Sequence, residues 1–377
     1  SGVSLEIFND VFDLILNNNK IIICWAMGLT QHENAVDNIR EIVNLLLLKG
    51  SIGKEGAGTC PVRGHSNVQG DRTVGIWESA PQAFLDKIEN KYGFKPTTKH
   101  GYSVIDAIKA MYEKKAKVFF GLGGNFISAV PDTRYSDQGL ANCNLTVHVS
   151  TKLNRSHLVT GKEALILPCL GRSEKDYQKT GVQVQSVENS MGIVSSTKGV
   201  LEPCSKDLLS EVAVVCGIAN ATLKERSKIN WLEYKDDYKL VRDDIAEVVD
   251  GFDDFNKRLK QPSGFYLPNG ARVRQFKTKT GKANFSSNKL PDWELKEEEL
   301  IMMTIRSHDQ FNTTIYGLDD RYRGVFNERR IVFMNREDMK ARNLQEQQVV
   351  NLKSEYKGVI REAYNFKIVG YDIPRNC

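Results

Sequence analysis

The segment from Pro61 to Gly70 holds the densest group of side chains that could do chemistry. It places a cation, Arg63, two residues before an imidazole, His65, in a glycine-bounded loop. A guanidinium is a permanent, two-pronged donor that suits a carboxylate, and an imidazole exchanges protons near neutral pH. The segment therefore predicts a loop that lines a ligand site. A solvated surface loop fits the same composition equally well.

Two glycine-containing turns follow predicted strands. The turn Gly28–Thr30 lies between a strand and a helix, where exposed N–H groups and the helix dipole favour an anion. The run Gly121–Asn125 includes three glycines, which let the backbone approach a phosphate or a ring closely. Such turns are common in α/β proteins, so a plain tight turn is the alternative at both places.

The second turn departs from the nicotinamide-dinucleotide fingerprint. Phe126 stands where the last glycine of GxGxxG belongs, and Asn142 and Asn144 stand where a ribose-binding acid is needed. A nicotinamide site is therefore disfavoured. The segment Lys152–His157 also follows a strand and fits either phosphate contacts or a polar helix start.

Metal-binding and thiol signals are weak. His32-Glu33 is not a zincin motif because position 36 is Val. The seven cysteines contain no CxxC, which excludes zinc-ribbon and sequential iron–sulfur spacings. Their wide spacing and odd number favour a reducing compartment. Buried, inert thiols are the default interpretation of Cys24, Cys60, Cys143 and Cys169.

Helices and strands that would position these residues alternate along the first half of the chain. Helical periodicity covers Glu6–Leu16, and Lys20–Met27 has the apolar run of a strand buried on both faces. Thr30 and Glu33 form a predicted capping box. The helix that follows has an apolar stripe from Val36 to Leu47, and Gly50 is its predicted C-cap.

A second set of elements has the same alternation. It comprises a helix over Ser103–Lys115 and strands over Lys117–Phe120, Thr146–Val149 and Ala164–Leu167. This alternation predicts an α/β fold with a doubly wound, mostly parallel sheet over residues 1–220. Ligands of such sheets bind at the carboxyl ends of the strands.

The remaining chain predicts a connector and a small β domain. Residues 221–299 are polar and charged, typical of helical and irregular segments. Residues 300–377 contain four predicted strands: Leu300–Ile305, Arg330–Met334, Gln348–Leu352 and Phe366–Val369.

Composition excludes several classes of protein. In 377 residues, 26% are charged and the net charge is only +5, so nothing indicates nucleic-acid binding. The longest apolar runs, Ile21–Met27 and Ile42–Leu48, are far shorter than the roughly 18 residues of a membrane span. The start shows no signal peptide. We expect a soluble, cytoplasmic protein without a membrane span.

In their order along the chain, several segments resemble the molybdopterin oxidoreductases of the dimethyl-sulfoxide-reductase superfamily, and most closely the formate-dehydrogenase-like α subunits. The resemblance covers most of the chain. The segments that support it are Trp25–His32 with Ala35–Asn38, Gly50–Gly58, Pro61–Gly70, Gly124-Asn125 with Pro131-Asp132, and Thr280–Phe285.

The resemblance implies a bis(molybdopterin guanine dinucleotide) cofactor carrying Mo or W. It assigns Met27, Gly28, Thr30 and Gln31 to one dinucleotide, and Gly123, Gly124 and Asn125 to its guanosine end. The last domain would contribute Arg306, Ser307, Gln310 and Asn312. Arg63 falls on the arginine that holds the anionic substrate, such as formate, and His65 replaces the family's glutamine beside it.

The resemblance also implies what lies outside this sequence. Family members place the metal's protein ligand and an iron–sulfur segment, which would bind a [4Fe–4S] cluster, before the region that matches Ile21–Gly70. Their last domain, a double-psi β-barrel, continues past the residue that matches Cys377. We therefore expect a fragment of an oxidoreductase, inactive alone, with an unknown electron acceptor. The alternative is a non-catalytic nucleotide- or partner-binding module.

Overall fold

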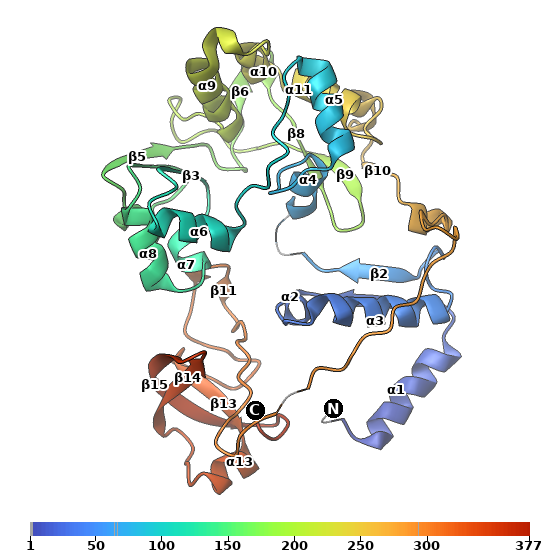
Figure 1. The fold of residues 1–377 in the computed structure, drawn as a ribbon, viewed down its shortest axis with the longest axis vertical. Coiled ribbons are helices and arrows are strands. Elements are labelled where there is room, and N and C mark those ends of the chain that lie inside the picture. Colours follow the sequence, from blue (N-terminus) through green and yellow to red (C-terminus); the bar gives the residue numbers. More distant parts are fainter. Residues whose placement is uncertain (1–2, 64, 66, 293) are drawn as a thin grey trace. The chain divides into compact units, whose positions relative to one another are not determined.

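The computed structural model describes residues 3–63, 65, 67–292 and 294–377, and its chain divides into two compact units (Figure 1). One unit spans Asn19–Asn288. The other joins the residues up to Asn18 with Lys289–Cys377. Gly64 and Ser66, within the predicted anion-binding loop, lie outside the described residues.

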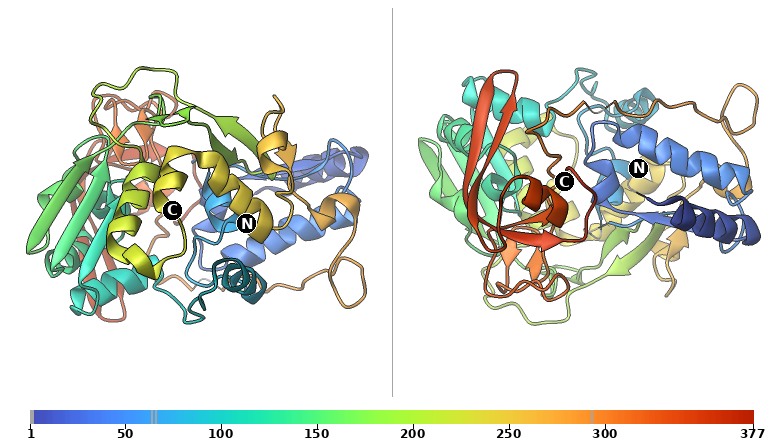
Figure 2. Two further views of the ribbon diagram at one scale, coloured as in Figure 1. Left: turned by 90° about the horizontal axis from the view of Figure 1, so that it is seen from above. Right: turned by 90° about the horizontal axis from the view of Figure 1, so that it is seen from below.

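A three-stranded parallel sheet is central to the Asn19–Asn288 unit. Its order is β3-β4-β5, with β3 (Val118–Leu122), β4 (Leu145–Ser150) and β5 (Glu163–Pro168), and Figure 2 shows the three strands side by side. The middle strand, β4, is the most buried. The three strands predicted over Lys117–Phe120, Thr146–Val149 and Ala164–Leu167 are thus confirmed.

Helices next to this sheet share its core. In α6 (Val104–Tyr112), Ser103 is the N-cap, and its hydroxyl accepts a hydrogen bond from Asp106 N at 3.3 Å. Buried side chains of α6, α7 (Phe126–Ala129) and α8 (Thr133–Ala141) pack together and against Phe119 of β3. The helix predicted from Ser103 is confirmed.

A second parallel pair forms a separate sheet. It consists of β1 (Ile22–Trp25) and β2 (Gly58–Pro61). Among the described residues of this unit, the parallel strands named above thus lie in two sheets rather than in one doubly wound sheet. The expectation that β1 is buried on both faces is wrong: Ile22 is 55% exposed, because β1 has one neighbouring strand in its sheet.

The segment after β1 differs from the predicted capping box. Thr30 ends a one-turn helix, α2 (Met27–Thr30), and so cannot cap the next helix. Asn34 is the N-cap of α3 (Ala35–Leu48), without a side-chain cap. The prediction that Gly50 is the C-cap glycine is confirmed, since its φ is +62°. Gly50 N donates to Leu47 O at 3.0 Å and Ser51 N donates to Leu46 O at 2.8 Å, and these two bonds form a Schellman motif.

The later part of this unit has its own core. The antiparallel sheet β10-β9-β8 packs against helices that lie between β9 and β10 in the chain, and Val194, Phe252, Phe255, Leu259 and Phe265 are buried together. The remaining elements of the unit are α4 (Val68–Thr73), α5 (Gln82–Tyr92), η1 (Arg155–Leu158), β6 (Tyr177–Gln178), β7 (Gly181–Val182), β8 (Gln185–Glu188), β9 (Ile193–Thr197), α9 (Glu211–Leu223), η2 (Lys224–Arg226), α10 (Trp231–Asp236), α11 (Tyr238–Val248), α12 (Phe255–Arg258), β10 (Phe265–Tyr266) and η3 (Gly270–Val273).

The other unit contains α1 and a mixed sheet. The sheet has the order β13-β15-β14, with β13 (Ile331–Asn335) parallel to β15 (Val359–Tyr371) and β14 (Val349–Tyr356) antiparallel to it. Met334, Met339 and Ile368 form its core. The other elements are α1 (Leu5–Asn17), α13 (Arg336–Ala341) and the hairpin β11 (Gln310–Phe311) and β12 (Thr314–Ile315).

Four of the five elements predicted in this unit are confirmed: the first helix and the strands near 330, 348 and 366. The strand predicted over Leu300–Ile305 is wrong, since these residues are irregular chain. Leu300 packs against the sheet core, whereas Met302 and Met303 are 63% and 65% exposed. In the run Leu300–Ile305, the first residue thus packs against the core while Met302 and Met303 are exposed, so the side chains do not alternate between two faces as they would in a strand.

Candidate functional site

The turn after β3 leaves room for a ligand next to its backbone. Gly123 and Gly124 have φ values of +72° and +76°, which L side chains rarely adopt. A Cβ at Gly124 would meet no atom within 4 Å. Gly123 N donates to Val149 O at 2.8 Å, so the turn continues the parallel pairing of β3 with β4. The backbone here is exposed, and its conformation requires glycine.

Residues that follow β4 hold this turn in place. Asn154 Nδ2 donates to Gly124 O at 2.9 Å. The Ser156 hydroxyl donates to Asn125 Oδ1 at 3.1 Å and accepts from Ile127 N at 3.0 Å. Ser156 is only 1% exposed, so these bonds form away from water. We call Asn154 and Ser156 the turn clamp.

Two buried imidazoles lie behind the turn clamp. His157 Nδ1 accepts from Asn154 N at 3.0 Å, which leaves the proton on Nε2, 3.1 Å from Ser150 Oγ. The His148 ring centroid is 4.9 Å from that of His157, and His148 Nε2 is buried without a hydrogen-bond partner in the structure. Burial, and then the His157 ring, lower the pKa of His148. Both rings therefore suit a neutral, packed role.

The carboxyl ends of β1 and β2 bring two predicted site segments to one sheet edge. Trp25 pairs with Pro61, and Val62 N donates to Trp25 O at 2.7 Å. Met27 follows one strand and Arg63 the other, and both side chains lie exposed. The helix after β1 has only one turn, so it provides little of the dipole expected beside Gly28.

The loop after β2 is anchored at its far end. Asn67 Oδ1 accepts from Glu188 N at 2.9 Å, and Gln69 Nε2 donates to Glu188 Oε1 at 2.8 Å. Glu188 is 5% exposed, and its Oε2 is buried without a hydrogen-bond partner in the structure. His65 is exposed, as is Arg63. Glu188 is far from the loop in the chain, and no sequence motif predicted it as part of the site.

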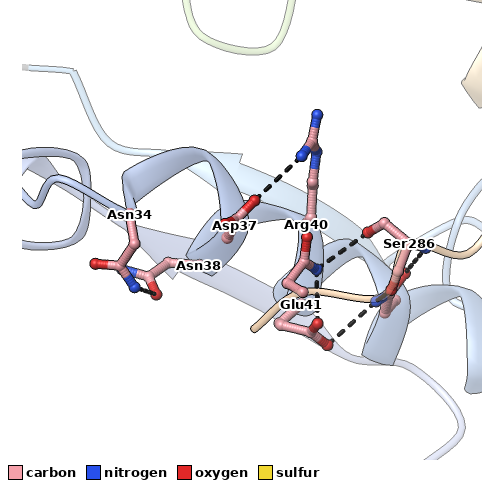
Figure 3. A network of polar contacts seen from close by, with 8 residues as sticks. Asn34, Asp37, Asn38, Arg40, Glu41 and Ser286 are labelled. Atoms are coloured by element: carbon pink, nitrogen blue, oxygen red, sulfur yellow. Dashed lines mark hydrogen bonds and ion pairs between the residues drawn. The ribbon is translucent and has the colours of Figure 1, made fainter. Parts of the chain in front are cut away.

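A further contact network ties Ser286 and Asn288, which directly follow the Thr280–Phe285 segment, to α3 (Figure 3). Asn44 Nδ2 donates to Ser286 O at 2.8 Å, and Ser286 N donates back to Asn44 Oδ1 at 3.2 Å. Asn288 Nδ2 donates to Glu41 Oε1 at 2.6 Å, and this bond, followed by that from Asn44, lowers the pKa of Glu41. The chain directly after the Thr280–Phe285 segment is thus held on α3.

The four predicted residues of the other unit lie on or just before one hairpin, β11–β12. Arg306 Nη1 and Gln310 Nε2 both donate to Asn312 O, at 3.1 Å each. Arg329 Nη1 donates to the Ser307 hydroxyl. The group therefore presents arginines and amides around one turn, a donor-rich set suited to phosphate or a nucleobase. Because this hairpin belongs to its own unit, its residues form a separate group.

Within the part of the chain that the structure describes, no three or more His, Cys, Asp or Glu side chains come together in a way that could hold a metal ion. None of the helices described combines the length and the apolar character needed to cross a membrane.

Comparisons with protein families match both ends of the chain. Residues 2–191 match the family described as "Molybdopterin oxidoreductase". Residues 300–370 match "Molydopterin dinucleotide binding domain". Together, the two matched regions include the segments that follow β1, β2 and β3, and the residues Arg306, Ser307, Gln310 and Asn312.

Curated relatives are similar over nearly the whole chain. An uncharacterized oxidoreductase of Mycobacterium tuberculosis is 48% identical over 380 residues, covering 99% of this chain and 49% of the relative. Protein YdeP of Escherichia coli is 47% identical over 355 residues, covering 93% and 47%. A putative formate dehydrogenase of Bacillus subtilis, YrhE, is 27% identical over 208 residues, covering 52% and 21%. The chain spans about half the length of the first two relatives. The chain belongs to the molybdopterin oxidoreductase family.

Proposed function

We propose that the full-length protein binds bis(molybdopterin guanine dinucleotide) with Mo or W and oxidises a small anion such as formate. The observation that supports this most directly is the clamped glycine turn Gly123–Asn125, in a chain of the molybdopterin oxidoreductase family. When bound, the cofactor supplies the two-electron redox chemistry. The protein supplies binding, orientation and charge.

The residues present fit such a group. The open space beside Gly124 allows close approach of a nucleotide, and the turn clamp keeps the backbone in place before binding. Gly123, Gly124 and Asn125 would hold a guanosine end, while Met27, Gly28, Thr30 and Gln31 hold the rest of that dinucleotide. Arg306, Ser307, Gln310 and Asn312 offer a second donor set for the other one.

Arg63 would orient the substrate. Its guanidinium pairs with a carboxylate through charge-assisted hydrogen bonds, and its exposed position leaves it accessible. Formate oxidation releases carbon dioxide, one proton and two electrons, and we propose His65, two positions after Arg63 in the chain, as the group that receives that proton. The electron acceptor is not identified. The name of the Bacillus subtilis relative supports formate as the model substrate.

The wider assignments are proposals of the same kind. Residues 1–220 would bind one dinucleotide, 221–299 connect, and 300–377 contribute part of a double-psi barrel. A [4Fe–4S] cluster and the metal's protein ligand would belong to sequence outside this chain, so we expect the 377-residue chain alone to be inactive. We further propose a cytoplasmic protein that acts on a small molecule rather than on nucleic acid.

Cofactor content is the first test. The full-length protein is expressed with an active cofactor pathway and analysed for Mo, W and oxidised pterin. The expected result is one metal and two pterins per chain. Absence of both would overturn the proposal and favour a module that binds nucleotides or partners without catalysis.

The role of Arg63 is tested in cofactor-loaded protein. Arg63→Ala is expected to lower kcat/KM for formate roughly 10- to 100-fold through lost charge-assisted hydrogen bonds, mostly as a higher KM. Arg63→Lys keeps the charge but not the fork, so it should recover only part of the loss. Arg72→Ala is the matched control, since Arg72 is also exposed and pairs with Glu78 at 3.3 Å. Undiminished formate-dependent dye reduction by Arg63→Ala, with metal bound, would exclude this role.

A further inference from the structure

Two cysteines that are far apart in the chain are direct neighbours in the β1–β2 sheet. Cys24 pairs in register with Cys60. Cys24 is exposed and Cys60 half-buried, in contrast to Cys143, Cys169 and Cys216, which are buried. The expectation of inert buried thiols therefore holds for Cys143 and Cys169 and is wrong for Cys24.

The geometry of the pair is that of a potential cross-link. Register partners on neighbouring parallel strands point to the same face, and the strands are ~4.8 Å apart. That spacing falls within the Cα separations of roughly 4.4–6.8 Å that disulfides require. The Cys24 thiol forms a hydrogen bond with the Cys60 thiol, and this bond is the main cause of the raised pKa of Cys60. The two sulfurs thus already face each other.

We propose that Cys24 and Cys60 are a dithiol site that a peroxide converts to a reversible disulfide. The exposed Cys24 sulfur attacks one peroxide oxygen, the O–O bond breaks, and a sulfenic acid and water form. The Cys60 sulfur then displaces the sulfenic oxygen, and the S–S bond forms. With hydrogen peroxide, two thiols and one peroxide give one disulfide and two waters. A dithiol reductant reverses the reaction by exchange.

The site lies directly before the segments assigned to cofactor and substrate. Met27 lies three positions after Cys24, and Arg63 lies three positions after Cys60. A disulfide would join the ends of β1 and β2 covalently, next to the bond from Val62 N to Trp25 O. It would thereby limit how far these two segments can separate. This consequence rests on the proposed function, whereas the thiol chemistry does not.

The test counts thiols in the full-length protein. Reduced protein is treated with hydrogen peroxide, blocked with N-ethylmaleimide in denaturant and digested for mass spectrometry. We expect a peptide pair joining Cys24 to Cys60, lighter by two hydrogens than the two thiols, and within this chain's sequence a fall from seven blocked cysteines to five. Dithiothreitol should restore all seven.

Variants separate this site from general oxidation. Cys24→Ser should abolish the cross-link, while Cys204→Ser, which removes another exposed thiol, should leave it unchanged. Recovery of Cys24 and Cys60 as separately blocked thiols, at a peroxide concentration that oxidises Cys204, would overturn the proposal. A cross-link between two protein molecules would overturn it as well. None of these readouts depends on cofactor, so failure of the proposed function would leave them intact.

Discussion

The turn after β3 and the loop after β2 both follow parallel strands of the Asn19–Asn288 unit, but they are held in different ways. The turn clamp bonds both the backbone and a side chain of Gly123–Asn125, and Ser156 is almost fully buried. The loop with Arg63 and His65 is exposed and is anchored through Asn67 and Gln69 at its far end. A nucleotide held for the life of the enzyme suits the first arrangement, and a substrate that must enter and leave suits the second.

Among the changes that test this difference between the turn and the loop, removal of the Ser156 hydroxyl should have the largest effect on stability and on cofactor binding. Ser156→Ala loses two hydrogen bonds and leaves the buried Ile127 N–H without its partner. We expect the free energy of unfolding to fall by about 2–3 kcal/mol, together with a loss of bound pterin. Urea unfolding and pterin content of the purified protein measure the two effects.

The matched control is Ser136→Ala. Ser136 is as buried as Ser156, but its hydroxyl donates to Pro131 O at 2.9 Å and does not touch the glycine turn. It should cost about 1 kcal/mol and leave pterin content unchanged. Equal pterin loss in both variants would show that the clamp acts only through general stability.

Removing the anchor of the β2 loop should have a smaller effect on stability and a different one on function. Asn67→Ala leaves Glu188 N without its acceptor, which should cost about 1–2 kcal/mol. Pterin content should persist while the KM for formate rises. Loss of pterin without a change in KM would contradict the division between the two regions.

The smallest expected effect is a pH dependence of stability from His148. Its pKa in the folded protein lies below the ordinary value of 6.5, so below that pH the unfolded chain binds more protons than the folded one. Stability should therefore decrease as the pH falls from 7 towards 5, by at most about 1.4 kcal/mol per pH unit. His148→Gln should flatten the slope of urea midpoint against pH; an unchanged slope would assign the dependence to other groups.

Local sequence patterns predicted many of the elements. The helix near Glu6–Leu16, the helix after Ser103, the strands of the β3-β4-β5 sheet and those of the mixed sheet follow from periodicity and caps that lie within a few residues of each other. No pattern predicted β2. Gly50 follows from the conformation that a helix end requires. The order of the family-like segments was sufficient to identify the molybdopterin oxidoreductase family.

Predictions failed where a choice depended on distant partners. Thr30 has the chemistry of an N-cap, but it is the last residue of the one-turn helix α2, and Asn34 is the N-cap of α3. The run Lys20–Met27 has the composition of a doubly buried strand, yet burial depends on how many strands lie beside it. The pattern of residues within one strand does not show how many strands lie beside it.

By itself, the sequence determined which residue types stand at the strand ends: glycines that allow close approach, an arginine that stays charged, and thiols without a metal-binding spacing. Only the tertiary structure decided which of them meet. It placed Ser156 and Asn154 on the glycine turn, Glu188 on the β2 loop, and Cys24 beside Cys60. The physical reason is range: propensity and capping act over a few residues, whereas strand register and buried hydrogen bonds join segments that the chain keeps far apart.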